Sequence, residues 1–384
     1  MLIQIHMLQN YSPANLNRDD TGSPKDAVFG GVRRGRISSQ CLKRSIRRSD
    51  AFATAFSDKG LLGVRTRRLP YLVQEELVKL GIQDPELQEI VAHVSQIGRE
   101  STKGKDNQKD EVEGEEKTEA VEEKESQVKQ LIFIGRDELK PMAQKLVDIY
   151  RRLGSKAWKT TDIGKITKEL GSSLPKSVDI AMFGRMTTSD AFEDVDAAVQ
   201  VAHAISTNAL SEEFDYFTAV DDLANEPGAG MIGDIEFNSS TYYKYLNVHW
   251  EELLLNLGGD IEIAKQAVVS LIDAAATAQP SGKQNTFAAF NLPDLLLIEI
   301  SDRNLPVSYA NAFLKPVKAS REETFMEVSQ KQLSDYMEKI CNSYNLDAKR
   351  AYLSVDGSTI PLAEKKASLK DVEKWVESHL PAEG

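Results

Sequence analysis

The residues from Val195 to Asn208 alternate between two kinds of side chain. The odd positions carry Val195, Ala197, Val199, Val201, His203 and Ile205, whereas the even positions include Asp196, Gln200, Ser206 and Asn208. A period of two with β-branched residues on one side predicts a half-buried strand in spite of the alanines, and a strand of this kind requires a sheet. His203 falls on the apolar side, which favours a hydrogen-bonded core histidine over a metal ligand or a catalytic base.

Further strands and helices are predicted on both sides of this strand. Strands are expected at Leu2–Leu8, Val178–Met186, Thr241–Trp250 and Leu295–Ile300. Helices are expected after Ser38 or Ser39, at Ile261–Ala278, at Glu322–Ile340 and from Ser368 onward. Without insertions the order is strand, helix, strand, strand, helix, strand, which is the split βαβ pattern of ferredoxin-like and RRM domains. We therefore predict an α+β fold.

Residues 60–172 interrupt this order and indicate a helical insertion. The expected helices lie at about Leu72–Leu80, Pro85–Gly98, Asp137–Leu153 and Thr161–Leu170. Residues 101–126 are charged and almost free of aromatic residues, which is typical of a disordered surface loop. Such an acidic tract could screen charge or bind a partner, but a tolerated insertion is the simpler interpretation. Residues 209–240 are also long, polar and rich in glycine before the strand pattern resumes, and loops of this length often carry function.

The charge of one stretch opposes that of the whole chain. The 384 residues have a formal net charge of −12, yet residues 18–48 hold nine basic and only three acidic side chains. A local excess of this size predicts a binding site for a polyanion, while the acidic remainder repels nonspecific nucleic acid. The alternative is a solvated basic helix face, but the basic residues extend from a loop into the helix.

The local pattern of this stretch suits phosphate. Gly30 and Gly31 permit a tight turn, and Ser38 or Ser39 is a good N-cap for the following helix. Leu42 and Ile46 lie one turn apart and can face a core. The remaining positions carry two basic pairs at i,i+4 spacing, Lys43 with Arg47 and Arg44 with Arg48. Backbone N–H groups, the helix dipole and guanidinium forks can then bind a phosphate together. Residues Pro280 to Lys283 form either a further phosphate loop or a plain turn.

Three carboxylates near this stretch offer an enzymatic alternative. Asp19, Asp20 and Asp26 could hold Mg²⁺ or activate a 2′-hydroxyl of bound RNA. We favour a structural role, in which they pair with neighbouring arginines. The five histidines show no metal-ligand spacing, so no metal or cofactor is expected. Two cysteines fit a reducing cytoplasm, and no apolar run approaches the roughly 18 residues needed to span a membrane.

The same residues resemble a known family. The motifs are LNRDD at Leu16–Asp20, KDAVFGG at Lys25–Gly31, GRMTTS at Gly184–Ser189, VAHAIST at Val201–Thr207, FTAVDDL at Phe217–Leu223, FAAFN at Phe287–Asn291 and SYANAF at Ser308–Phe313. Together they closely resemble the CasC family, the repeated backbone subunit (RAMP superfamily) of the type I-E CRISPR Cascade complex. The resemblance implies an RRM-like palm (1–59, 173–208 and 241–384), helical fingers (60–172) and a protruding thumb hairpin (209–240).

The resemblance also implies roles for individual residues. The guide backbone is held by Lys25, Ser38, Gln40, Lys43 and Arg47, to which the basic stretch adds Arg18 and Arg34, and the phosphate loop adds Lys283. Met186, Phe217 and Thr218 hold a flipped guide nucleotide, since an apolar wedge can separate bases and an aromatic ring can stack on a displaced one. Arg68 falls where the fingers of the family approach target DNA.

The function implied is that of a non-catalytic subunit. Copies bind one CRISPR RNA head-to-tail, kink it at regular intervals and present it for pairing with target DNA in antiviral defence. Its partners are further copies of itself and the large, small, guide-capping and guide-processing subunits. One rival is a metal-dependent RNA endonuclease that uses Asp26. Another is a sequence-neutral single-strand binder that works alone.

Overall fold

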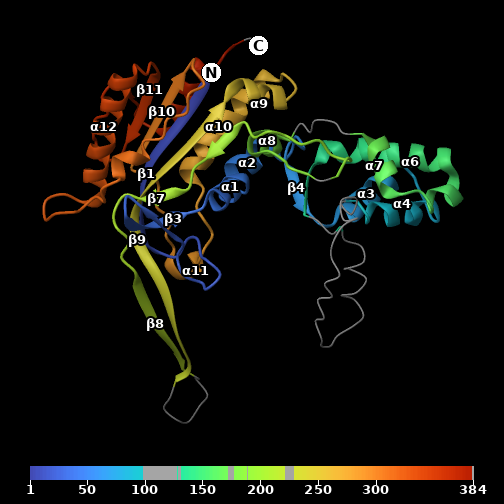
Figure 1. Ribbon diagram of the computed structural model, residues 1–384, viewed down its shortest axis with the longest axis horizontal. Helices are drawn as coiled ribbons and strands as arrows, with labels where there is room; N and C mark the ends of the chain where they lie inside the picture. The colour runs from blue at the N-terminus through green and yellow to red at the C-terminus, as the bar shows by residue number, and fades with distance from the viewer. Residues whose placement is uncertain (98–127, 129–130, 172–176, 188, 221–228, 383–384) are drawn as a thin grey trace. The chain divides into compact units, whose positions relative to one another are not determined.

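The structure is a computed structural model (Figure 1). It describes residues 1–97, 128, 131–171, 177–187, 189–220 and 229–382. The chain divides into two compact units, which are described separately. The sheet unit comprises residues 1–55, 199–251 and 264–384, and the helical unit comprises residues 56–198 and 252–263. The predicted acidic tract at 101–126 lies outside the described residues.

The sheet unit is built on one large sheet that is antiparallel except for the pair β11 and β12. The strands run in the order β12-β11-β10-β1-β9-β7-β3-β2, and β6 and β8 also pair with β9. Their bounds are β1 (Leu2–Ala14), β2 (Asp26–Phe29), β3 (Val32–Ile37), β6 (Val199–Val201), β7 (Ala204–Ser206), β8 (Glu213–Val220), β9 (Ala229–His249), β10 (Leu295–Ser301), β11 (Lys349–Ser354) and β12 (Glu364–Lys365). The helices of this unit are α1 (Ser39–Arg47), α2 (Asp50–Phe56), α10 (Ile261–Thr277), α11 (Gln284–Phe287), η1 (Ala310–Phe313), α12 (Phe325–Tyr344) and α13 (Leu369–His379). Helix α9 (Trp250–Asn256) begins in this unit, and most of its residues belong to the helical unit. The predicted α+β class is confirmed.

Strand β1 is central because both of its edges are paired. It runs antiparallel to β9 and to β10, and all of its residues from Leu2 to Gln9 are buried. Successive residues of the paired strand β9 then face different cores. Tyr243 packs with Leu333 and Met337 of α12, whereas Tyr242 packs with Leu42 of α1. The sheet is therefore covered on both faces, and α1 is anchored by its own apolar stripe.

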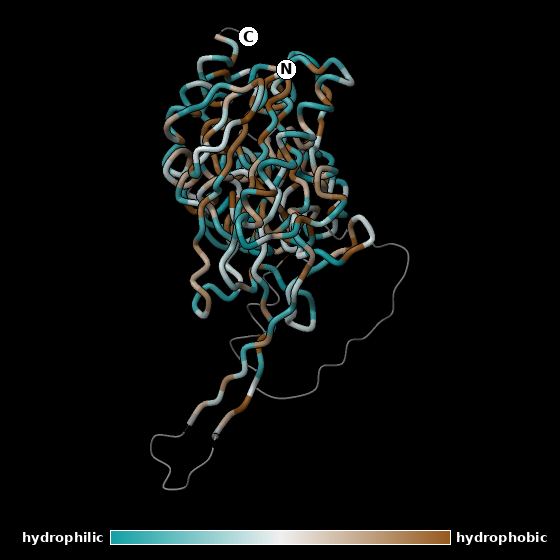
Figure 2. The backbone as a smooth tube through the Cα atoms, turned by 90° about the vertical axis from the view of Figure 1, so that its left-hand side faces the viewer, coloured by the Kyte–Doolittle hydropathy of each residue, from teal (hydrophilic) through white to brown (hydrophobic). Residues whose placement is uncertain are grey.

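Strands β8 and β9 form a long hairpin at the predicted thumb. The register runs from Glu213 opposite Phe237 to Ala219 opposite Met231. Figure 2 shows these two strands running out beyond the other strands of the sheet, with hydrophilic and hydrophobic residues on both. Strand β9 then continues without interruption into the sheet, so the hairpin is rigidly joined to it.

The strand predicted over residues 195–207 is interrupted, and its phase changes. Val201 pairs with Leu246 of β9, but Ile205 pairs with Tyr243, so the strand has one extra residue in between. Such a β-bulge moves the following side chains to the opposite face. His203 is consequently exposed rather than buried, and its ring lies 3.1 Å from the guanidinium of Arg36. The prediction of a core histidine is wrong.

The helical unit contains the predicted helices and one short two-stranded sheet. Its elements are β4 (Gly63–Thr66), β5 (Ile132–Gly135), α3 (Leu69–Lys79), α4 (Glu86–Val94), α6 (Arg136–Trp158), α7 (Ile163–Leu170) and α8 (Val178–Phe183). The strand predicted at Val178–Met186 is instead helix α8. All six residues of α8 are buried, including Asp179, which accepts a hydrogen bond from the backbone N–H of Gly63 at 2.8 Å. Tertiary packing thus outweighs the β-propensity of the sequence. No helix in the described part of the chain is long and apolar enough to cross a membrane.

Candidate nucleic-acid interface

The β2–β3 hairpin holds the first half of the basic stretch. Gly30 has φ +62° at its tip, and a Cβ there would lie 1.9 Å from the carbonyl oxygen of Leu314, so only glycine fits. Arg34 is fully buried below the tip. Its guanidinium donates to the carbonyls of Ser206, Thr207 and Phe313 at 2.7–2.9 Å. Burial lowers the pKa of Arg34. Arg34 therefore holds the hairpin to the sheet, and its guanidinium does not reach the surface, contrary to the expectation from the sequence.

Two of the three acidic residues of this region, Asp19 and Asp26, are engaged in local contacts. Asp26 accepts a hydrogen bond from Nε of Arg33 at 2.6 Å, and Arg33 also forms an ion pair with Glu212 at 2.6 Å. Asp19 accepts from the hydroxyl and the backbone N–H of Thr21, and these bonds lower the pKa of Asp19. Asp26 is thus tied to an arginine as favoured from the sequence, whereas Asp19 shapes its own loop.

Helix α1 begins and faces the core as predicted. The Ser38 side chain accepts from the backbone N–H of Cys41 at 3.3 Å, which caps the helix, and Leu42 and Ile46 are its buried residues. The first turn also exposes Gln40. The two basic pairs lie differently, since Lys43 and Arg47 are half-buried whereas Arg44 and Arg48 are exposed.

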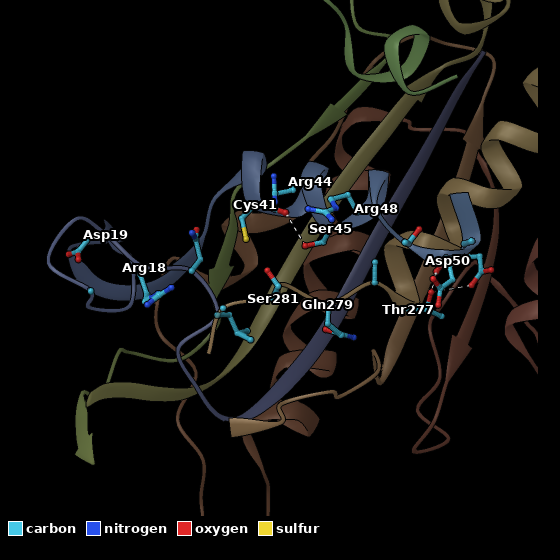
Figure 3. Close-up of a pocket in the computed structure, with 18 of the residues that line it drawn as sticks. Arg18, Asp19, Cys41, Arg44, Ser45, Arg48, Asp50, Thr277, Gln279 and Ser281 are labelled. Atoms are coloured by element: carbon cyan, nitrogen blue, oxygen red, sulfur yellow. Dashed lines mark hydrogen bonds between the residues drawn. The ribbon is translucent and has the colours of Figure 1, made fainter. Parts of the chain in front are cut away.

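An open cleft of about 1130 Å³ lies beside α1. It is formed by the loop after β1, one side of α1, the end of α10 and the segment that follows α10 (Figure 3). Its lining residues are Leu16, Asn17, Arg18, Asp19, Asp20, Thr21, Gly22, Cys41, Arg44, Ser45, Arg48, Ser49, Asp50, Ala51, Asp273, Thr277, Ala278, Gln279, Ser281 and Gly282. Figure 3 shows Arg18 and Asp50 toward opposite ends, with Arg44 and Arg48 between them. Three arginines and four aspartates line the cleft, so it presents side chains of both charges.

The predicted phosphate loop closes this cleft. A Cβ on Gly282 would lie 2.2 Å from the carbonyl oxygen of Leu16, so the two loops touch through their backbones. Lys283 follows in the left-handed conformation, with φ 49°, and precedes α11. Ser281 and Gly282 line the same cleft as Arg18.

Lys25 lies in a smaller neighbouring cavity. This cavity is also lined by Asn17, Arg36 and Tyr242. Partial desolvation of the exposed His203 ring, together with the nearby charges of Arg36 and Lys25, lowers the pKa of His203. The positive charges of Arg36 and Lys25 therefore disfavour protonation of His203.

Among the nucleic-acid-binding residues predicted from the sequence, only Arg18 lines the cleft. Phe217 and Thr218 lie on β8, where Phe217 is half-buried and Thr218 is exposed. Met186 and Arg68 belong to the helical unit; Met186 is 93% exposed and Arg68 directly precedes α3. The residue before Met186 is anchored, because buried Arg185 forms an ion pair with Glu138 at 2.7 Å. The apolar side chain of Met186 is therefore exposed, while the ion pair of Arg185 holds the preceding residue in place.

Several cleft residues were not among those selected from the sequence. The sequence predicts Arg44 and Arg48 as a basic pair, whereas the resemblance implies guide-binding roles for Lys43 and Arg47. Cys41 and Gln279 carried no signal, because polar or sulfur-containing side chains of this kind are common in any fold. They become visible only when α1 and the segment after α10 are brought together.

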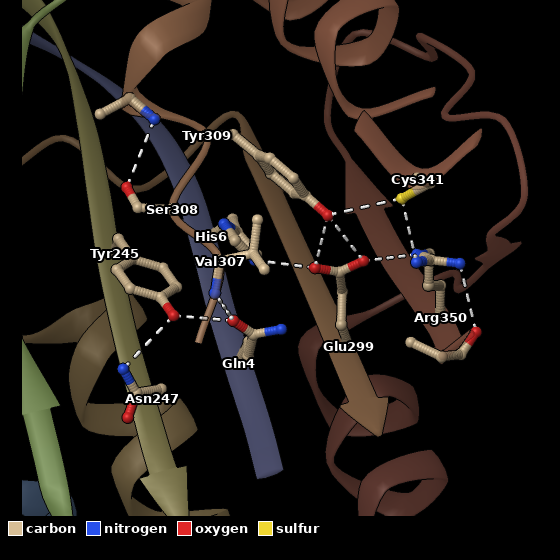
Figure 4. Close-up of polar contacts among 12 residues, drawn as sticks. Gln4, His6, Tyr245, Asn247, Glu299, Val307, Ser308, Tyr309, Cys341 and Arg350 are labelled. Atoms are coloured by element: carbon tan, nitrogen blue, oxygen red, sulfur yellow. Dashed lines mark hydrogen bonds and ion pairs between the residues drawn. The ribbon is translucent and has the colours of Figure 1, made fainter. Parts of the chain in front are cut away.

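A second polar cluster is buried on the other face of the sheet (Figure 4). Glu299 of β10 accepts hydrogen bonds from Tyr309 and Arg350 and lies 3.1 Å from Nε2 of His6. Arg350 also donates to the sulfur of Cys341 at 3.2 Å. Burial acts to raise the pKa of Glu299, but the hydrogen bond to His6 and the charge of Arg350 lower it to about 2. All these groups are enclosed, so the cluster fastens β1, β10, β11 and α12 together rather than forming an open site.

These features define an α+β protein whose candidate nucleic-acid interface is the cleft beside α1. A family model described as CT1975-like protein matches residues 3–378. The chain belongs to this CT1975-like protein family.

Solved structures give further comparisons. A chain titled "CRISPR RNA-guided surveillance complex, pre-nicking" is 30% identical, with a TM-score of 0.79, and the match covers 99% of this chain and all of the other. A second, titled "CRISPR RNA-guided surveillance complex", is 25% identical with a TM-score of 0.60 and the same coverage. No curated protein matches. The relatives agree with the resemblance to CRISPR proteins but do not assign the type of complex.

Proposed function

We propose that this protein is a non-catalytic, CRISPR RNA-binding backbone subunit of a Cascade surveillance complex, of type I-E, acting in the cytoplasm. Copies polymerise head-to-tail along the guide, kink it at regular intervals and present it for pairing with target DNA in antiviral defence. The solved relatives support a place in a surveillance complex, since both are chains of RNA-guided assemblies matched over their whole length. The other proposed partners in the complex are the large, small, guide-capping and guide-processing subunits.

The architecture supports the division into palm, fingers and thumb. The strand order β10-β1-β9-β7, with α1 after β1 and α10 between β9 and β10, is the order expected of a ferredoxin-like palm. The helical unit supplies the fingers and the β8–β9 hairpin the thumb. Met186, Phe217 and Thr218 would then act on flipped nucleotides, and Arg68 would lie near target DNA.

The observation that carries the proposal is the position of α1. Its cap and its buried Leu42 and Ile46 fix the helix on the sheet, so its basic residues must lie at its exposed side and at the cleft. The cleft as a whole is lined by three arginines and four aspartates, so the basic residues of α1 and its C-cap are the groups suited to a sugar-phosphate backbone in a protein with a net charge of −12. Bound by its backbone, the guide keeps its bases available for pairing.

Co-expression with the natural neighbouring proteins tests this proposal. We expect a particle that contains several copies of the chain and RNA of one length, measured by native mass spectrometry and gel electrophoresis of the extracted RNA. A monomer that binds any single strand and carries no RNA would instead support the stand-alone binder.

The endonuclease alternative is disfavoured by one contact. The carboxylate of Asp26 is held by Arg33, which leaves it poorly placed to coordinate a metal. Incubation of the assembled protein with Mg²⁺ and complementary RNA should leave that RNA intact. Regularly spaced cuts that disappear in Asp26→Ala would establish the alternative.

A further inference from the structure

A buried lysine lies in the sheet behind the cleft. Lys244 of β9 is only 2% exposed. Its Nζ donates to Oε1 of Gln9 and to the hydroxyl of Tyr11, the latter at 3.1 Å. Among the described residues, no carboxylate lies within ion-pairing distance of this ammonium group. A buried charge without a counter-charge is costly, so a cation at this position requires an explanation.

Hydrogen bonds connect Lys244 to the cleft. The Tyr11 hydroxyl donates to Oε1 of Gln279 at 2.7 Å, and Nε2 of Gln9 donates to the same oxygen at 3.2 Å. Gln279 lines the cleft between α1 and the segment after α10. Two hydrogen bonds therefore separate the lysine from the surface at which an anion would lie.

The groups around Lys244 supply no neutralising charge at neutral pH. They are Tyr11 and Gln9 on β1, Tyr242 on β9, Cys41 on α1 and Gln279 after α10. Burial raises the pKa of Tyr242 and of the Cys41 thiol, so both stay protonated. Burial also lowers the pKa of Lys244, to about 7, against a weak opposing effect of Cys41. The charged residues that line the cleft are Arg18, Asp19, Asp20, Arg44, Arg48, Asp50 and, on α10, Asp273. The charges of Lys25 and Arg44 also act on Cys41.

We propose that Lys244 is a positioning residue of the RNA cleft, and that an RNA phosphate seated against Gln279 supplies its missing counter-charge, so that the cleft takes up a proton when RNA binds. This inference rests on the proposed function of the cleft. The proton comes from solvent and stays on Nζ of Lys244, and no covalent bond is formed. The Tyr11 hydroxyl links the ammonium to Oε1 of Gln279, and Nε2 of Gln279 donates one of its two hydrogens to the carbonyl of Asn291 at 2.8 Å. The second N–H of the Gln279 amide is the donor for the phosphate.

Calorimetry with the full chain and a single-stranded RNA of mixed sequence tests the inference. Binding is measured between pH 7.5 and 8.5 in HEPES and in Tris, whose ionisation enthalpies differ, so the difference in binding heat gives the protons taken up. This range lies above that in which His203, with its lowered pKa, would titrate. We expect a fractional proton uptake in the wild-type protein. If the phosphate raises the pKa of Lys244 by one unit, affinity falls about tenfold from pH 6 to pH 9.

Two variants separate the outcomes. Lys244→Met should abolish the proton uptake, whereas Lys349→Met, at an exposed position of β11, should retain it. RNA binding without proton uptake by the wild-type protein would overturn the inference and leave the proposed function intact. A flat isotherm at low salt would overturn both. If Lys244→Met fails to fold, the wild-type measurement in the two buffers still decides the question.

Discussion

The ring of Phe217 lies over Gly233, its partner across the β8–β9 hairpin, so closely that a Cβ on Gly233 would lie 2.6 Å from the ring. The hairpin thus holds an aromatic side chain in a fixed position outside the core. We expect Phe217→Ala to change the free energy of unfolding by less than about 1 kcal/mol, because the ring is only half-buried.

The same variant should blur the periodic protection of guide bases, measured by chemical probing of the assembled complex. Phe214→Ala, on the same strand, is the matched control, because Phe214 is 63% exposed and faces Glu236 rather than a glycine. An unaltered footprint in Phe217→Ala would remove the nucleotide-flipping role of this ring.

Arg34 gives a prediction about stability alone. Arg34→Ala leaves three buried carbonyls without their donor, so we expect a loss of about 3–5 kcal/mol in the free energy of unfolding. Arg34→Lys should not rescue it, because an ammonium cannot reproduce the guanidinium fork. Urea denaturation provides the measurement, and near-normal stability of both variants would contradict the structural role.

The two basic pairs of α1 can be compared directly. Arg44→Ala with Arg48→Ala removes two exposed cleft guanidiniums, and loss of two phosphate contacts should lower the slope of log affinity against log salt by about 1.4. The double variant Lys43→Ala with Arg47→Ala tests the pair implied by the resemblance. We expect it to bind the guide more weakly without a change in fold. Equilibrium RNA binding at several salt concentrations distinguishes them, and a slope unchanged in both double variants would count against α1 as the backbone site.

The Glu299 cluster predicts a dependence of stability on acid. The pKa of Glu299 is lowered to about 2 in the folded protein, against about 4.3 in an unfolded chain, so its stabilising contribution is present above pH 4.3 and is lost as the pH falls toward 2. Glu299→Gln should remove that part of the pH dependence. Urea midpoints measured from pH 5 to pH 2.5 test this, and parallel curves for the two proteins would show that Glu299 does not contribute.

Much of the sheet unit could be predicted because its signals are local. The apolar run of β1, the serine cap of α1 and the stripe of Ala264, Val268 and Ile272 on α10 each depend on residues close in sequence. Signals of this kind allow a helix or a strand to be predicted from its own residues, without knowledge of tertiary contacts.

The errors have tertiary causes. The bulge between Val201 and Ile205 is a mismatch with β9 that the sequence of one strand does not show. All residues of helix α8 are buried, so its apolar residues do not show the 3.6-residue period from which a helix is predicted. The cleft joins residues near 18 and 44 to Gln279, and that proximity depends on the whole sheet.

The most direct test of the central claim is to map where the guide touches the protein. Guide RNA carrying 4-thiouridine is incorporated into the assembled complex, crosslinked, and the attached peptides are identified by mass spectrometry. We expect crosslinks in residues 16–22, 41–51 and 277–282, the segments that line the cleft. Crosslinks confined to other surfaces, such as α12 and β11, would contradict the assignment of the cleft as the site that holds the guide.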